Sequence, residues 1–149
     1  MVHNIIRNKS DLFTLTRRDL ADLYERAVNS ESKRARILVH QDNDHQTHEM
    51  IILLIKGGEP FKPHRHPKGK SESYHIIEGE LGVNIFDDEG HLVSSFILSK
   101  DIPYFRNSNC TWHQPFPVST YVCYHEVYTG PFDKEKDVEE CPWSTTEKE

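Results

Sequence analysis

The chain has 149 residues, the length of one domain with one modest core. Hydrophobic residues make up 36% and charged residues 28%, a balance typical of a soluble globular protein and not of a disordered or fibrous one. The formal net charge is -6 without a basic stripe, which argues against a nucleic-acid partner. No apolar run approaches the roughly 20 residues that span a bilayer, and residues 1–9 show no signal-peptide core.

The cysteines of the chain indicate the environment in which it folds. The three cysteines, Cys110, Cys123 and Cys141, are odd in number and form no C-x-x-C pair, so neither a disulfide framework nor a zinc knuckle is indicated. We therefore expect a cytoplasmic protein without a membrane partner.

Residues 15–29 carry the clear helical pattern of the chain. Apolar side chains recur at the spacing of one helix face at Leu20, Leu23, Tyr24 and Ala27. Thr16 suits the N-cap, and Asp19 favours the positive end of the helix dipole.

From residue 34 onward the pattern changes to short strands and turns. The unbroken apolar run at 51–55 is typical of a strand covered on both faces. Further strands are expected at 36–40, 61–66, 72–77, 81–86, 92–98, 102–105 and 121–128. Many short strands after one helix predict an all-β barrel or jelly roll, with another β-sandwich or a lipocalin-like barrel as alternatives.

The expected organisation is a single domain in three parts. A helical segment over 1–33 packs on a barrel over 34–132, and a charged tail follows over 133–149. The tail shows no apolar periodicity, so we expect it to be extended or partly disordered.

The ten histidines are the anomaly in the composition, and their positions indicate a metal site. His64 and His66 are two apart, so in a strand both imidazoles point to one face. Glu72 begins the next expected strand after a short turn, and His113 lies in a comparable setting further along. Three imidazoles and one carboxylate suit one divalent transition metal (Fe, Mn, Ni, Co or Zn) and leave room for a small-molecule substrate.

The surrounding string, GGEPFKPHRHPKGKSESYHIIEG, is longer and more specific than H-x-H. Five residues separate Gly58 from His64, five separate His66 from Glu72, and six separate Glu72 from Gly79. This string resembles the first motif of the cupin superfamily, with a slightly longer turn between the second histidine and the glutamate. The stretch over 108–113 resembles the second motif, although Ser108 and Cys110 replace its usual proline and glycine.

Within that superfamily, residues 15–132 are similar to the small WbuC-type cupin metalloproteins often encoded beside surface-polysaccharide genes. The similarity includes the segments KRAR, PHRHP, IFDDEG, TWH and EVYTGPF. It implies a cupin barrel (a double-stranded β-helix or jelly roll) with an N-terminal helix, a bound metal and a common tendency to form homodimers.

Several other residues are candidates for the site. Tyr74 shares the strand face of Glu72 and could carry a proton or be an ordinary core aromatic. The resemblance favours Glu126 as a carboxylate beside the ligands. Arg34 and Arg36 share a face and could hold an anionic group or form a solvated basic edge. Trp112 could wall the substrate pocket or pack in the core.

Three functions stay open at this point. The first is a metal-dependent isomerase or epimerase that acts on a sugar or nucleotide sugar, with Glu126 or Tyr74 moving the proton. The second is an iron-dependent dioxygenase. The third is a non-catalytic binding or sensor module in which the metal holds a ligand or stabilises the barrel.

Overall fold

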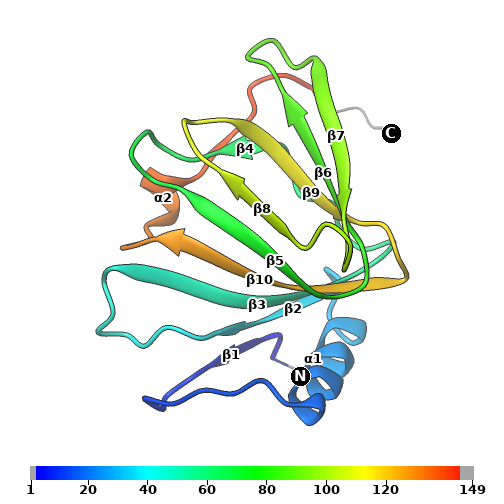
Figure 1. Ribbon diagram of the computed structural model, residues 1–149, viewed down its shortest axis with the longest axis vertical. Helices are drawn as coiled ribbons and strands as arrows, with labels where there is room; N and C mark the ends of the chain where they lie inside the picture. Colours follow the sequence, from blue (N-terminus) through cyan, green and yellow to red (C-terminus); the bar gives the residue numbers. More distant parts are fainter. Residues whose placement is uncertain (1–2, 145–149) are drawn as a thin grey trace.

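The computed structural model describes residues 3–144 and contains two β-sheets that face each other (Figure 1). The larger, six-stranded sheet has the order β1 (Ile5–Arg7), β2 (Arg34–Leu38), β3 (Thr47–Ile55), β10 (Tyr121–Thr129), β5 (Glu72–Glu78) and β8 (Tyr104–Asn107). The five-stranded sheet has the order β11 (Glu139–Glu140), β4 (His64–Arg65), β9 (Trp112–Pro117), β6 (Leu81–Phe86) and β7 (Leu92–Leu98). The architecture is therefore all-β, as predicted.

The main core lies between the two sheets. It takes Met50, Ile52 and Leu54 from β3, and Leu81 and Val83 from β6. Because alternate residues of a strand point to opposite faces, β3 sends Ile51 and Leu53 to the other side of the larger sheet. This confirms the prediction that the apolar run is covered on both faces.

Helix α1 (Arg17–Val28) covers that second face (Figure 1). It buries Leu23 and Ala27 completely against Ala35, Ile37 and Leu53. Thr16 and Asp19 form a reciprocal capping box, each side chain accepting from the other residue's backbone N–H. Neither helix between residues 3 and 144 is long and apolar enough to cross a membrane.

The segment over 133–144 differs from the expected extended or disordered tail, whose last residues, 145–149, lie outside the described part of the chain. It forms the short helix α2 (Lys134–Asp137), and β11 then pairs with β4. Trp143 packs edge-on against Trp112, with ring centroids 5.0 Å apart. Polar and aromatic contacts of this kind produce no hydrophobic periodicity, which is why the sequence pattern did not reveal them.

Candidate metal centre

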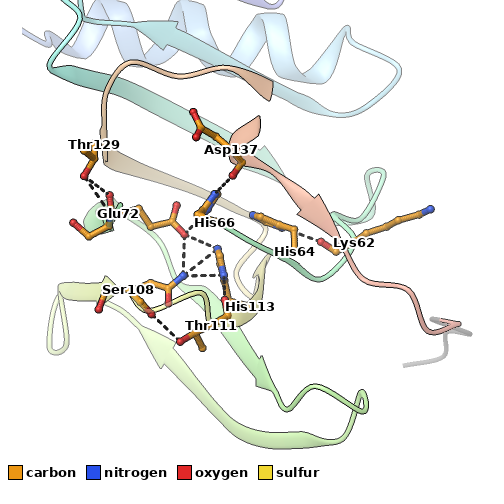
Figure 2. Close-up of polar contacts among 11 residues, drawn as sticks. Lys62, His64, His66, Glu72, Ser108, Thr111, His113, Thr129 and Asp137 are labelled. Atoms are coloured by element: carbon orange, nitrogen blue, oxygen red, sulfur yellow. Dashed lines mark hydrogen bonds and ion pairs between the residues drawn. The ribbon is translucent and has the colours of Figure 1, made fainter. Parts of the chain in front are cut away.

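Three histidines converge where β4 meets β9 (Figure 2). His64 lies in β4 directly opposite His113 of β9, and His66 follows β4 on the same side. One ring nitrogen from each lies within 4.8 Å of the others, and the group could hold a metal ion. Sheet pairing thus brings His113 to the two histidines that the H-x-H spacing had already placed together.

Each imidazole has a main-chain carbonyl oxygen beside its Nδ1 atom. The distances are 3.0 Å from His64 to Lys62, 2.7 Å from His66 to Asp137 and 2.9 Å from His113 to Thr111 (Figure 2). A carbonyl oxygen can only accept, so each of these contacts favours a proton on Nδ1. A neutral ring of this kind presents the lone pair of Nε2, which is the arrangement that metal-binding histidines adopt.

Glu72 completes the group from the start of β5. Its side chain is 1% exposed, and its Oε2 lies 3.0 Å from Nε2 of His66 and 2.5 Å from Nε2 of His113. Two neutral Nε2 lone pairs would repel a carboxylate oxygen at these distances, so the group requires positive charge, from protons on the rings or from a cation. The donor set therefore fits a divalent transition metal.

Opposing influences act on the ionisation of these side chains. Burial acts to raise the pKa of Glu72, but the charges and hydrogen bonds of His113 and His66 hold it well below its usual value. Burial acts to lower the pKa of His66, but Glu72 raises it above the usual value. Burial, with the adjacent His113, lowers the pKa of His64 to about 4. Near neutral pH, His64 is therefore a neutral donor and Glu72 is a carboxylate.

Asn107 is a member of this group that the sequence analysis missed. It ends β8 directly opposite Glu72 and is 6% exposed. Its side-chain nitrogen donates to Oε2 of Glu72 at 3.2 Å and lies 2.8 Å from Nδ1 of His113. The one available signal was its position at the end of a strand shortly before His113.

The two predicted proton carriers, Glu126 and Tyr74, lie opposite each other on β10 and β5. Burial, together with the charge of Glu72, raises the pKa of Glu126 well above its usual value. Tyr74 is 1% exposed and packs against the rings of Tyr124 and Phe105. Burial and the nearby Glu72 raise the pKa of Tyr74 well above its usual value. Both side chains therefore lie beside Glu72, and both favour their protonated forms.

The two predicted arginines lie on the barrel side of β2, the face that also carries Leu38. Arg36 is exposed, and its guanidinium lies 3.7 Å from Sδ of Met50, the residue of β3 that is paired with Glu126 of β10. The Arg34 guanidinium lies 4.3 Å from the centre of the Phe61 ring, beside a groove of about 200 Å³. Of the two, Arg36 is the one that faces Glu126.

Trp112 does not face the histidines. It precedes His113 in β9, so the two side chains point to opposite faces of the strand. Its ring lies 4.2 Å from the Arg65 guanidinium, and its Nε1 donates to Asp88 at 3.0 Å. Trp112 is 3% exposed on the outer side of the barrel, which favours packing in the core over the alternative of contact with substrate.

His48 gives the fold a pH dependence that can be measured. Burial, together with the nearby His40 and Arg36, lowers the pKa of His48 to about 4. The unfolded chain therefore binds more protons than the folded chain between about pH 4 and the ordinary histidine pKa of about 6.5. We expect the free energy of unfolding to fall as the pH falls through this window, by at most about 1.4 kcal/mol per pH unit from this group.

The measurement is urea unfolding of the metal-free protein at several pH values. His48→Gln should flatten the pH dependence, whereas His45→Gln, on an exposed loop, should leave it unchanged. Parallel curves for wild type and His48→Gln would contradict the expectation.

Comparison with known proteins assigns the chain to a family. The model of the domain of unknown function DUF6016 matches residues 15–98, more than half of the chain. The chain belongs to this family. No curated protein sequence matches it.

Solved structures show that this DUF6016 protein has a cupin fold. The cupin domain of Cnp3 from Schizosaccharomyces pombe is 14% identical with a TM-score of 0.51, over 66% of this chain and 66% of that one. An oxalate oxidase in complex with the substrate analogue glycolate is 16% identical with a TM-score of 0.54, over 76% and 58%. CapF with the inhibitor 3-isopropenyl-tropolone is 13% identical with a TM-score of 0.61, over 75% and 32%. The chain thus spans 66% or less of the length of these proteins.

Proposed function

We propose that this DUF6016 protein is a metal-dependent enzyme that isomerises or epimerises a small polar molecule such as a sugar or nucleotide sugar. The observation that carries the proposal is the set of three imidazoles whose Nδ1 atoms all lie beside carbonyl oxygens, so that their Nε2 atoms converge. His64, His66, His113 and Glu72 would hold one divalent ion of Fe, Mn, Ni, Co or Zn. When bound, such an ion acts as a Lewis acid toward a carbonyl or hydroxyl oxygen.

Glu126 is the group best suited to move a proton. The raised pKa lets this carboxyl group exist in the protonated form beside Glu72, so it can return a proton as well as accept one. Arg36, near Glu126, would bind a carboxylate or phosphate of the substrate. The Tyr128 ring lies 4.9 Å from that of His66, and burial together with the nearby Asp137 carboxylate raises the pKa of Tyr128, so its hydroxyl is a further polar group beside the site.

The sugar substrate is supported by the similarity of residues 15–132 to WbuC-type cupins and their association with polysaccharide genes. Three free cysteines suit a reducing, cytoplasmic setting. The edge strand β7 exposes Leu92 and Val93, which favours pairing with a second copy in a homodimer. We also propose that the chain divides into a helical segment over 1–33, a barrel over 34–132 and a tail over 133–149.

The test uses protein purified without a metal-chelating tag, analysed for metal and then assayed with nucleotide sugars in D2O by NMR. We expect deuterium uptake at a carbon beside a carbonyl or hydroxyl group. Glu126→Gln should lower the rate about 10²- to 10⁴-fold, because a positioned acid–base group contributes that much. The control, Glu80→Gln, changes an exposed carboxylate and should leave the rate unchanged. Metal-loaded protein that exchanges no proton on any sugar would overturn the proposal.

A dioxygenase is the second candidate, supported by the fold shared with an oxalate oxidase. Bound iron, together with oxygen consumption that depends on added substrate, would support the dioxygenase. Calorimetric binding of a sugar or organic acid without turnover would select instead a binding or sensor module.

A further inference from the structure

The segment over 133–143, here called the C-terminal strap, lies along the strand that carries the first histidines. In register, Glu139 of β11 lies opposite Arg65, and Glu140 lies opposite His64. The backbone N–H of Cys141 donates to the carbonyl of Pro63 at 2.9 Å. The strap therefore completes the hydrogen bonding of β4 on the side away from β9.

Within the strap, Asp137 makes the direct contact with the histidines. Its carbonyl oxygen accepts the Nδ1–H of His66 at 2.7 Å (Figure 2). This contact joins residues 71 positions apart, whereas the corresponding carbonyls for His64 and His113 lie two residues earlier in the chain. The orientation of His66 thus depends on a distant part of the chain.

The side chain of Asp137 fixes the position of that carbonyl. The carboxylate is 3% exposed and lies 3.1 Å from the Lys70 ammonium, and it accepts the backbone N–H of Asp133 at 2.8 Å. Lys70 also donates to the carbonyl of Pro131 at 2.6 Å. The Asp137 end of this ion pair is buried, so losing Lys70 would leave an uncompensated carboxylate there.

Lys70 lies in the turn between His66 and Glu72, the turn that is longer than in the usual cupin motif. The extra length of this turn therefore has a structural role in this protein. The turn that separates two of the proposed ligands also carries the cation that holds the strap.

We propose that Asp137 is a positioning residue of the metal centre: held by Lys70, its carbonyl orients the His66 ring so that Nε2 faces the site. The inference rests on the proposed function, since it concerns a ligand of the same centre. It adds a component that lies outside both cupin-like motifs.

The first test measures Co²⁺ binding by the full chain. Asp137→Ala and Lys70→Met should each weaken binding about 10- to 100-fold, as loss of groups that orient metal ligands does. The double variant should lose little more than either single variant, because both act through one contact. Asp137→Asn keeps an oxygen for the backbone N–H of Asp133 but loses the charge that pairs with Lys70, so it should recover part of the affinity that Asp137→Ala loses.

The matched control is Glu139→Gln, which removes an exposed ion pair with Arg65 elsewhere on the strap. We expect it to change the affinity by less than about threefold, since exposed pairs contribute little. If Asp137→Ala fails to fold, Lys70→Met decides the question. The proposal is overturned if folded Lys70→Met or Asp137→Ala binds Co²⁺ as tightly as Glu139→Gln.

The second test separates this inference from the metal centre itself. NMR of the metal-free protein reports directly whether Nδ1 of His66 carries a hydrogen-bonded proton. We expect this hydrogen-bonded proton in the wild type and its loss or weakening in Asp137→Ala. Wild-type protein that shows this hydrogen bond but binds no Co²⁺ would reject the metal centre and keep the positioning role. An unchanged His66 in Asp137→Ala would reject the positioning role.

Discussion

The double substitution His64→Ala, His66→Ala is expected to abolish metal binding. Elemental analysis of the wild type should find about one ion per chain, whereas the variant should carry a background amount. Because two of four donors are removed, we expect affinity to fall by at least about 1,000-fold, or roughly 4 kcal/mol. The measurement is metal content together with competition against a chelator of known affinity.

A matched control separates this loss from a general effect of removing histidines. His75 and His125 lie directly opposite each other on β5 and β10, and alternation along β5 puts His75 on the face away from Glu72. The double variant His75→Ala, His125→Ala should keep its metal. If the His64→Ala, His66→Ala protein folds and still binds one ion with wild-type affinity, the four-residue centre is wrong.

Replacing Gly79 by alanine is expected to cause a large loss of stability. Gly79 has φ of +84° in the turn between β5 and β6, and a Cβ there would lie 2.4 Å from the carbonyl oxygen of Tyr121. The left-handed backbone costs an L-residue roughly 1–2 kcal/mol, and forced overpacking adds about 1–3 kcal/mol. We expect the free energy of unfolding to fall by about 2–5 kcal/mol, measured by urea denaturation.

Gly57 provides the comparison for this substitution. It has φ of +92°, and a Cβ there would meet nothing within 4 Å. Gly57→Ala should therefore cost about 1–2 kcal/mol, from backbone strain alone. Equal losses in the two variants would show that the close approach of Gly79 to Tyr121 is unimportant.

The four proposed metal ligands could be predicted from the sequence because the patterns that indicate them are local. His64 and His66 share a face through the two-residue period of a strand, and Glu72 follows them after a short turn. His113 was identified through its T-W-H ending despite the altered residues before it. The structure brings these four together, and their binding of a metal stays a prediction.

Other parts of the site depend on tertiary structure that no local pattern reports. Asn107 meets Glu72 through strand pairing, and Asp137 meets His66 through a segment without periodicity. Trp112 was considered a wall of the pocket because no strand was predicted between residues 105 and 121. Had β9 been recognised, its alternation would have placed Trp112 opposite to His113.

The order of strands in the larger sheet has a consequence for how the protein folds. β10, the last of its strands in the sequence, pairs with both β3 and β5, so that Thr129 lies opposite Thr47. The loop closure that such distant partners require slows folding relative to a chain of successive hairpins. While the ribosome is still translating residues 121–129, β3 and β5 have exposed edges open to non-native association, so a nascent chain is most vulnerable to aggregation just before this strand is complete.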